Sequence, residues 1–390
     1  MKSIIKHPCS VFVVALCTLA SMPAAALEIE KVGAVPAEVQ TGKSGDWSYA
    51  VRQTLHTKLP STPNSADSLY NALHRPIWGG TYSGVASLFL ATSEGDFGCT
   101  GSLLSTGRHI LTAAHCVTDS AGVSTLIDGE ALFPSINAGG YKGAVEGVTF
   151  SSVSVHPLWN GRSFLNGNDV AVITLDAVAP ASVQRYDLYT GNNEPTQIHT
   201  KVGWGQVGLG NGTAVFNGGF RSGQNTYDAT GDLVDVAFGA PAQPGILYYD
   251  FDNGLFDNSL GYAPNDAFGY WFGINHLGLG LQEVNAAPGD SGGPTFIDGK
   301  LAGITSFGLT FWDDSNAQFS ILTSDATDPT VGPDSSFGEF GGDTRVSYHA
   351  KWINAQTIPE PQTYALLIAG LCAVGAVARR RQRSTAGLQR

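Results

Sequence analysis

Basic residues are scarce in this chain. Its 390 residues include 21 lysines and arginines against 33 aspartates and glutamates, a formal net charge of −12. With the chain ends set aside (Lys2, Lys6, five arginines after residue 378, and Glu360), residues 27–357 hold 14 basic against 32 acidic residues. A surface of this charge repels nucleic acid and anionic lipid, and it excludes both as expected partners.

Charge of either sign and cysteine are also limited. Charged residues make up 14% of the chain, whereas glycines number 49. Of the five cysteines, Cys9 and Cys17 lie near the start and Cys372 near the end, which leaves Cys99 and Cys116 between them. Low charge and abundant glycine favour a loop-rich all-β protein.

The start of the chain has the features of a secretory signal. Lys2 and Lys6 precede an apolar stretch over 11–20, and three small residues follow at 24–26. This order of charged, apolar and small residues predicts a signal peptide over 1–26, removed by signal peptidase. Export to an oxidising compartment would permit a disulfide.

The end of the chain contains a second apolar stretch. Pro359-Glu360-Pro361 is followed by fifteen apolar or small residues over 364–378 and then by three arginines. A membrane-spanning helix needs about twenty residues. The arrangement resembles the PEP-CTERM sorting signal of Gram-negative bacteria. It implies that segment 358–390 is a transient transmembrane anchor removed by an exosortase, leaving a secreted or cell-surface protein. A retained anchor or an amphipathic end helix is the alternative.

One short string gives the strongest chemical signal. Residues 288–294 read Pro-Gly-Asp-Ser-Gly-Gly-Pro, with Ser291 at the centre. A serine hydroxyl is a weak nucleophile unless a tight turn and nearby backbone N–H groups support its reaction. Glycines permit such a turn, because they lack a Cβ. The string predicts a nucleophilic serine, provided that a base and an acid lie elsewhere.

A base and an acid lie upstream. His115 follows a short apolar segment that predicts a strand end, and Asp169 opens a β-branched run over 169–175 that predicts a buried strand. Each residue alone fits a packed histidine or a turn aspartate equally well. Their order in the chain, His, Asp and then Ser, favours one catalytic set.

These three strings resemble the chymotrypsin/trypsin-like serine proteases. The resemblance runs over about residues 77–355 and includes Val155-His156-Pro157 and Val202-Gly203-Trp204-Gly205. It implies two antiparallel six-stranded β-barrels in a domain over 77–357, with a C-terminal helix near 351–355. It also implies a Cys99–Cys116 disulfide.

The resemblance assigns roles by position. His115 would be the general base, Asp169 its orienting acid and Ser291 the nucleophile, and the N–H groups of Gly289 and Ser291 would form the oxyanion hole. Ser306 would also help to hold Asp169. The strand with Ser306, Phe307 and Gly308 would bind the substrate backbone. The implied reaction is peptide hydrolysis through an acyl-enzyme, without metal or organic cofactor.

The sequence says less about how the protein is activated and which substrates it prefers than about the three candidate catalytic residues. Segment 27–76 reads as a propeptide or an N-terminal arm, and by the same resemblance a freed Ile77 amine would form an ion pair with Asp290 after cleavage. Pro76 complicates this, because cleavage after Arg75 would leave a proline at the new terminus. Asn285 stands at the expected base of the specificity pocket and supports no preference for basic side chains, unless Asp343 faces the pocket.

The long insertion over 206–284 is expected to pack, because it contains aromatic residues (Phe251, Phe256, Tyr270, Trp271 and Phe272). Its Asp250, Asp252 and Asn253 could ligate Ca²⁺, but the spacing lacks a later glutamate, so a turn is favoured and no metal is predicted.

Two rival functions stay open. One is a non-catalytic extracellular matrix or binding protein on the same fold, and the other is an esterase with the same residues. The protein is expected to be monomeric, with a protein or peptide as substrate.

Overall fold

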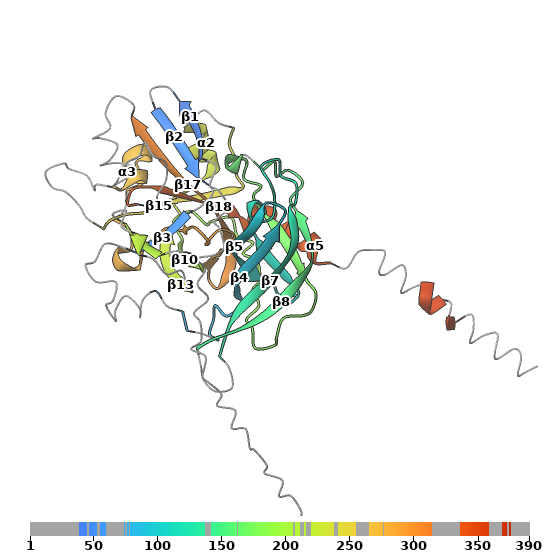
Figure 1. The fold of residues 1–390 in the computed structure, drawn as a ribbon. Coiled ribbons are helices and arrows are strands. Elements are labelled where there is room, and N and C mark those ends of the chain that lie inside the picture. Colours follow the sequence, from blue (N-terminus) through green and yellow to red (C-terminus); the bar gives the residue numbers. More distant parts are fainter. Residues whose placement is uncertain are drawn as a thin grey trace, which may run out of the picture.

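Most of the regular secondary structure in the described residues is β-strand, and nearly all of the strand pairs are antiparallel (Figure 1). The computed structural model describes residues 39–44, 47–52, 55–59, 74, 76–77, 79–136, 142–161, 163–205, 207–210, 214–215, 220–237, 241–254, 265–275, 277–313, 336–358, 369–372 and 374–375. The all-β class is confirmed. The predicted signal peptide lies outside these residues, as does most of the predicted sorting segment. No helix within them has the length and apolarity that a membrane crossing requires.

The first barrel is a closed ring of six strands, as predicted. Buried and half-buried positions alternate along β4, with Leu88 and Leu90 in the core, as expected for a strand with one solvent-facing side. In ring order the strands are β4 (Val85–Thr92), β5 (Gly95–Leu103), β6 (His109–Thr112), β9 (Ala171–Leu175), β8 (Lys142–Val155) and β7 (Leu126–Ile136).

The first and last strands of the second sheet come from one continuous stretch of chain. Its path begins at β13 and ends at β14, and only Tyr227 and Asp228 separate these strands. Tyr227 N–H donates to Gln197 beside β10, whereas Asp228 N–H donates to Tyr248 of β15. In the described residues this sheet is a half-barrel and not the predicted closed ring of six strands, because residues 221–230 are divided between β13 and β14; it is called the second barrel below. The path is β13 (Arg221–Thr226), β10 (Ile198–Gly203), β16 (Pro294–Ile297), β17 (Lys300–Asp313), β18 (Phe340–Arg345), β15 (Ile246–Asp250) and β14 (Ala229–Thr230).

Strands from the N-terminal arm extend this second sheet. β1 (Val39–Ser44) and β2 (Trp47–Arg52) form a hairpin, and β2 pairs antiparallel with β17. A third arm strand, β3 (Leu55–Leu59), lies in a separate three-stranded sheet, where it pairs with β11 (Val207–Leu209), which also pairs with β12 (Ala214–Val215). The predicted arm therefore contributes strands to the protein, and the described sheet has nine strands.

The insertion supplies strands to the second barrel (β13 to β15) and to the separate three-stranded sheet (β11 and β12). It supplies β11 to β15, the helices α2 (Gly231–Ala237) and α3 (Ala267–Phe272), and the 3-10 turn Gly280–Gln282. Phe251 is buried and Trp271 packs against the core, whereas Tyr270 is 40% exposed and Phe256 lies outside the described residues. The expectation that the insertion packs is met at the buried positions.

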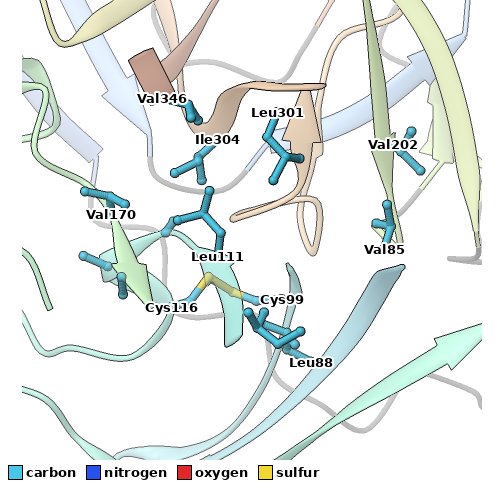
Figure 2. Close-up of a cluster of buried hydrophobic side chains, with 14 of the residues drawn as sticks. Val85, Leu88, Cys99, Leu111, Cys116, Val170, Val202, Leu301, Ile304 and Val346 are labelled. Carbon is cyan, nitrogen blue, oxygen red and sulfur yellow. A yellow bond between two sulfur atoms is a disulfide. The ribbon is translucent and has the colours of Figure 1, made fainter. Parts of the chain in front are cut away.

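Apolar side chains from both barrels meet around one disulfide (Figure 2). The predicted Cys99–Cys116 bond is present, with both cysteines buried and 17 residues apart in sequence. Leu111 of the first barrel and Ile304 of the second lie in the same cluster. The disulfide therefore fixes β5 to the turn after β6 at the place where the barrels meet.

The C-terminal helix α5 (Val346–Thr357) is longer than the predicted 351–355 and begins directly after β18. Its buried His349 donates from Nε2 to the carbonyl of Gly167 at 2.6 Å, two residues before Asp169. His349 and His156 lie with ring centroids 4.8 Å apart. Burial lowers the pKa of His349 to about 4.

Loss of the disulfide should destabilise the fold. In the chain-entropy account, a bond that closes a loop of this length contributes about 3 kcal/mol. We expect Cys99→Ala/Cys116→Ala to lower the free energy of unfolding in urea by this amount. Cys372→Ala is the control, because Cys372 is exposed and free, and it should leave the free energy unchanged. Equal stability of both variants would contradict a role for the disulfide.

His349 should make the fold sensitive to acid. The unfolded histidine has a pKa near 6.5, so the unfolded chain takes up a proton first as the pH falls. Stability from this residue is complete above pH 6.5 and is lost as the pH falls toward about 4, by roughly 3 kcal/mol in total. His349→Gln keeps an amide donor for Gly167 and should flatten this part of the stability curve between pH 7 and 4.5, measured by urea unfolding.

Candidate active site

Two neighbouring strands bring His115 and Asp169 together. His115 lies in a 3-10 turn (Ala114–Cys116) after β6, and Asp169 lies just before β9, with Thr112 paired opposite Ala171. Nδ1 of His115 is 2.6 Å from Oδ2 of Asp169, and the His115 backbone N–H donates to Oδ1 at 2.9 Å. The carboxylate thus holds both the ring and the backbone of the histidine.

The second barrel also contacts this carboxylate. Ser306 Oγ donates to Oδ2 of Asp169 at 2.6 Å, and Thr344 Oγ1 donates to the backbone carbonyl of Asp169 at 2.9 Å. Asp169 is fully buried. A buried carboxylate is stable in the ionised form only when such donors surround it.

A tight turn presents Ser291. Gly289 and Gly292 on either side have positive φ angles of 93° and 79°, which disfavour other residues. A Cβ at Gly292 would lie 2.0 Å from Oγ1 of Thr112, so only glycine fits there. Thr100 holds the turn from the first barrel: its N–H donates to the Ser291 carbonyl at 2.8 Å and its Oγ1 to the Gly289 carbonyl at 2.7 Å.

Ser291 lies close to the turn that contains His115. The Sγ atom of Cys116, the residue after His115, lies 3.6 Å from the Ser291 carbonyl oxygen. Nε2 of His115 is buried and makes no hydrogen bond within the described residues. Catalytic hydrogen bonds are often long without substrate and shorten when substrate binds.

The Asp290 carboxylate holds the turn by accepting two backbone hydrogen bonds. Its Oδ1 accepts from the Gly205 N–H at 2.7 Å and its Oδ2 from the Ala287 N–H at 2.9 Å. Burial raises the pKa of Asp290 to about 6, while these bonds and the Lys201 charge act in the opposite direction. Ile77 is 79% exposed, and its carbonyl accepts from the Gly80 N–H. The predicted Ile77–Asp290 ion pair requires a cleaved chain and stays a prediction.

Comparison with known proteins adds the family. Residues 80–218 match the trypsin family model, and residues 357–382 match the PEP-CTERM protein-sorting motif. Two separate segments of the chain are therefore similar to known families. The PEP-CTERM motif indicates export from a Gram-negative cell to the surface or beyond.

Related sequences agree with the trypsin domain. A trypsin of Saccharopolyspora erythraea is 27% identical over 225 residues, 56% of this chain and 79% of that protein. Alkaline trypsin B of Manduca sexta is 26% identical over 231 residues, 57% of this chain and 75% of that protein.

Two solved structures are similar to the chain at lower identity. Mouse neuropsin, a serine protease, has a TM-score of 0.48 and 19% identity. HL collagenase has a TM-score of 0.48 and 21% identity. Each match covers 73% of this chain and 98% of the other.

Two of the predicted substrate-binding residues, Asn285 and Phe307, have buried side chains. Asn285 is buried, and its Oδ1 accepts from the Ala286 N–H at 2.8 Å and from the Tyr249 hydroxyl at 3.3 Å. The Phe307 side chain is buried against Phe164 and Tyr248. Only the Phe307 backbone is left to meet a substrate.

Asp343 does not supply a free charge to a specificity pocket. It is fully buried and lies 2.7 Å from Nζ of Lys201, and Tyr227 and Thr295 each donate to its Oδ2 at 2.6 Å. Nζ of Lys201 also lies 4.6 Å above the Tyr249 ring. The condition under which Asp343 would attract basic side chains is therefore not met.

Sequence reasoning missed this Lys201–Asp343 pair. Burial lowers the pKa of Lys201, and the Asp343 charge opposes that shift. Lys201 also lines a small cavity with Asn285, Asp290 and Thr305. The sequence offered one local sign, a lysine within the strand over 198–203, and its partner lies 142 residues away along the chain.

Three buried carboxylates could hold a cation. Asp250, Asp252 and Asp266 each offer an oxygen within 4.8 Å of the others. Backbone donors already meet two of them, since Phe268 N–H donates to Asp250 and Gly269 N–H to Asp266. We assign no metal to this cluster.

The Lys201–Asp343 pair gives a stability prediction for the second barrel. Lys201→Met should lower the free energy of unfolding by about 3–5 kcal/mol, because it leaves Asp343 charged and buried without a cation. Adding Asp343→Asn to Lys201→Met should recover part of this loss. Urea unfolding measures both, and Lys300→Met at an exposed lysine is the control. An unchanged free energy for Lys201→Met would contradict the importance of the pair.

Proposed function

We propose that the protein is an exported serine endopeptidase that hydrolyses peptide bonds through an acyl-enzyme. The observation that carries this proposal is the hydrogen-bonded set of Ser306, Asp169 and His115 beside the Ser291 turn. A histidine held at Nδ1 by a buried carboxylate has its Nε2 available as a base. The match of residues 80–218 to the trypsin family supports the same reaction.

In the proposed mechanism, His115 Nε2 accepts the proton of Ser291 Oγ as that oxygen attacks the substrate carbonyl. Asp169 fixes the neutral tautomer of His115 and stabilises its protonated form. The N–H groups of Gly289 and Ser291 receive the developing oxyanion. Protonated His115 then donates to the leaving amine. In the second half of the reaction His115 accepts a proton from the water that attacks the acyl carbonyl, and it returns that proton to Ser291 Oγ as the acid product leaves.

Specificity follows from the charges near the turn. Asn285 is neutral, and Asp343 is compensated by Lys201. The two positions that could have attracted a basic side chain therefore offer no free carboxylate. We propose that the residue before the scissile bond is recognised without an ion pair.

The chain ends complete the proposal. Segment 1–26 would be removed by signal peptidase and segment 358–390 by an exosortase, leaving a monomeric trypsin-like domain over 77–357 after loss of the arm. Cleavage before Ile77 would free an amine that adds to the two backbone donors already on Asp290.

A fluorophosphonate probe tests the proposed nucleophile. Wild type should be labelled at Ser291, because an activated serine attacks the phosphorus centre, and Ser291→Ala should not be labelled. Ser291→Ala should also lower kcat for peptide hydrolysis by about 10⁴- to 10⁶-fold. Ser105→Ala, at an exposed turn, should behave as wild type.

Two outcomes would count against a peptidase. No labelling of folded, correctly processed wild type would favour the non-catalytic binding protein. Labelling together with cleavage of esters but not of amides would favour the esterase.

A further inference from the structure

The N-terminal arm forms a strand beside the residues proposed to bind substrate. β2 pairs with β17 over six consecutive residues, from Trp47 opposite Asp313 to Arg52 opposite Gly308 (Figure 1). Gly308 is the last of the three residues predicted to bind a substrate backbone. Because the pairing is antiparallel, the arm runs along β17 toward Ser306.

The register shows which edge of β17 the arm occupies. Gly308 and Leu309 pair with β18 as well as with β2, so these two strands lie on opposite edges. Gly303 and Ile304 pair with both β16 and β18. β2 and β16 therefore share one edge of β17, with a gap between them.

The Ser291 turn lies in that gap. Gly292 N–H donates to the Thr305 carbonyl, and Thr305 N–H donates to the Gly293 carbonyl, both at 2.9 Å. No described strand pairs with Ser306 or Phe307 on this edge. A peptide that added to the edge here would lie against the Ser291 turn and would reach Gly308 within two residues.

The N-terminal arm makes a second contact with the rest of the protein. β3 pairs parallel with β11, from Thr57 opposite Val207 to Leu59 opposite Leu209. β11 begins two residues after Gly205, whose N–H donates to Asp290. The arm is thus attached at two places, one on the strand that continues from Thr305 and one on the strand that follows Gly205, and both of these residues hydrogen-bond to the Ser291 turn.

We infer that the arm is a built-in competitor for an extended peptide, occupying from Gly308 onward the sheet edge that such a peptide would use. An incoming strand needs the same backbone N–H and C=O groups that β2 now engages, so both cannot bind together. The ligand class is an extended peptide of at least six residues, held mainly by backbone hydrogen bonds. Its position before the scissile bond rests on the proposed function, since Ser291 is taken as the nucleophile.

Binding can be tested without catalysis. The full chain with Ser291→Ala is titrated into a fluorescein-labelled synthetic peptide of residues 47–52, and fluorescence polarisation is recorded. Adding Ala50→Pro should weaken the β2 ladder, because proline lacks the N–H and disturbs the strand. Loss of one or two backbone hydrogen bonds should raise the apparent affinity about tenfold. A scrambled peptide is the control.

A covalent lock provides the opposite test. Ala50 and Thr310 are direct partners in the ladder, and paired antiparallel residues have Cα distances that a disulfide can bridge. In Ala50→Cys/Thr310→Cys, oxidation of the new cysteine pair to a disulfide should abolish peptide binding. Reduction of that disulfide should restore the binding. Ala50→Cys alone, treated in the same way, is the matched control. This second variant keeps the test decisive even if Ala50→Pro fails to fold.

The outcomes separate the two proposals. Weaker binding in the locked chain and tighter binding after Ala50→Pro are expected. Equal binding by locked and reduced chains would overturn the competitor role. With Ser291 restored, the lock should reduce hydrolysis of long peptides more than that of single-residue amides. Peptide binding that follows the lock, in a chain without any hydrolysis, would overturn the peptidase and retain the competitor role.

Discussion

The buried carboxylate of Asp169 is the constraint on which the arrangement of both barrels depends. It lies in the first barrel, yet one of its donors, Ser306, comes from the second, and Thr344 holds its backbone from the second as well. Moving the barrels apart would leave a charge in an apolar surrounding without these donors, at a cost of several kcal/mol. The requirement to solvate one ion therefore fixes the relative placement of the histidine and serine.

Different interactions stabilise the two barrels. The first has an apolar interior tied by a disulfide, whereas the second contains a buried Lys201–Asp343 pair, three tyrosines and many small residues. A buried ion pair contributes little net stability but strongly disfavours arrangements that separate its members. In the second barrel it joins β10 to β18, strands that are not neighbours in the sheet.

Local strings predicted the parts of the site that depend on local geometry. The turn at Gly289 and Gly292, the buried strand after Asp169 and the strand end before His115 each follow from a few adjacent residues. The Lys201–Asp343 pair could not be predicted, because an ion pair across 142 residues leaves no local pattern. The β2–β17 ladder was equally hidden, since its bonds are made by backbone groups that every residue possesses. The break between β13 and β14 depends on which neighbour each backbone group faces, and this too has no local pattern.

Thr100 connects the disulfide to the Ser291 turn. This residue directly follows Cys99, and its backbone and hydroxyl hold the carbonyls of Ser291 and Gly289. Disulfides form in oxidising compartments and are rare in reducing ones. The strand that holds the Ser291 turn is therefore tethered only in an oxidising space, which makes the geometry of that turn depend on the compartment in which the chain folds.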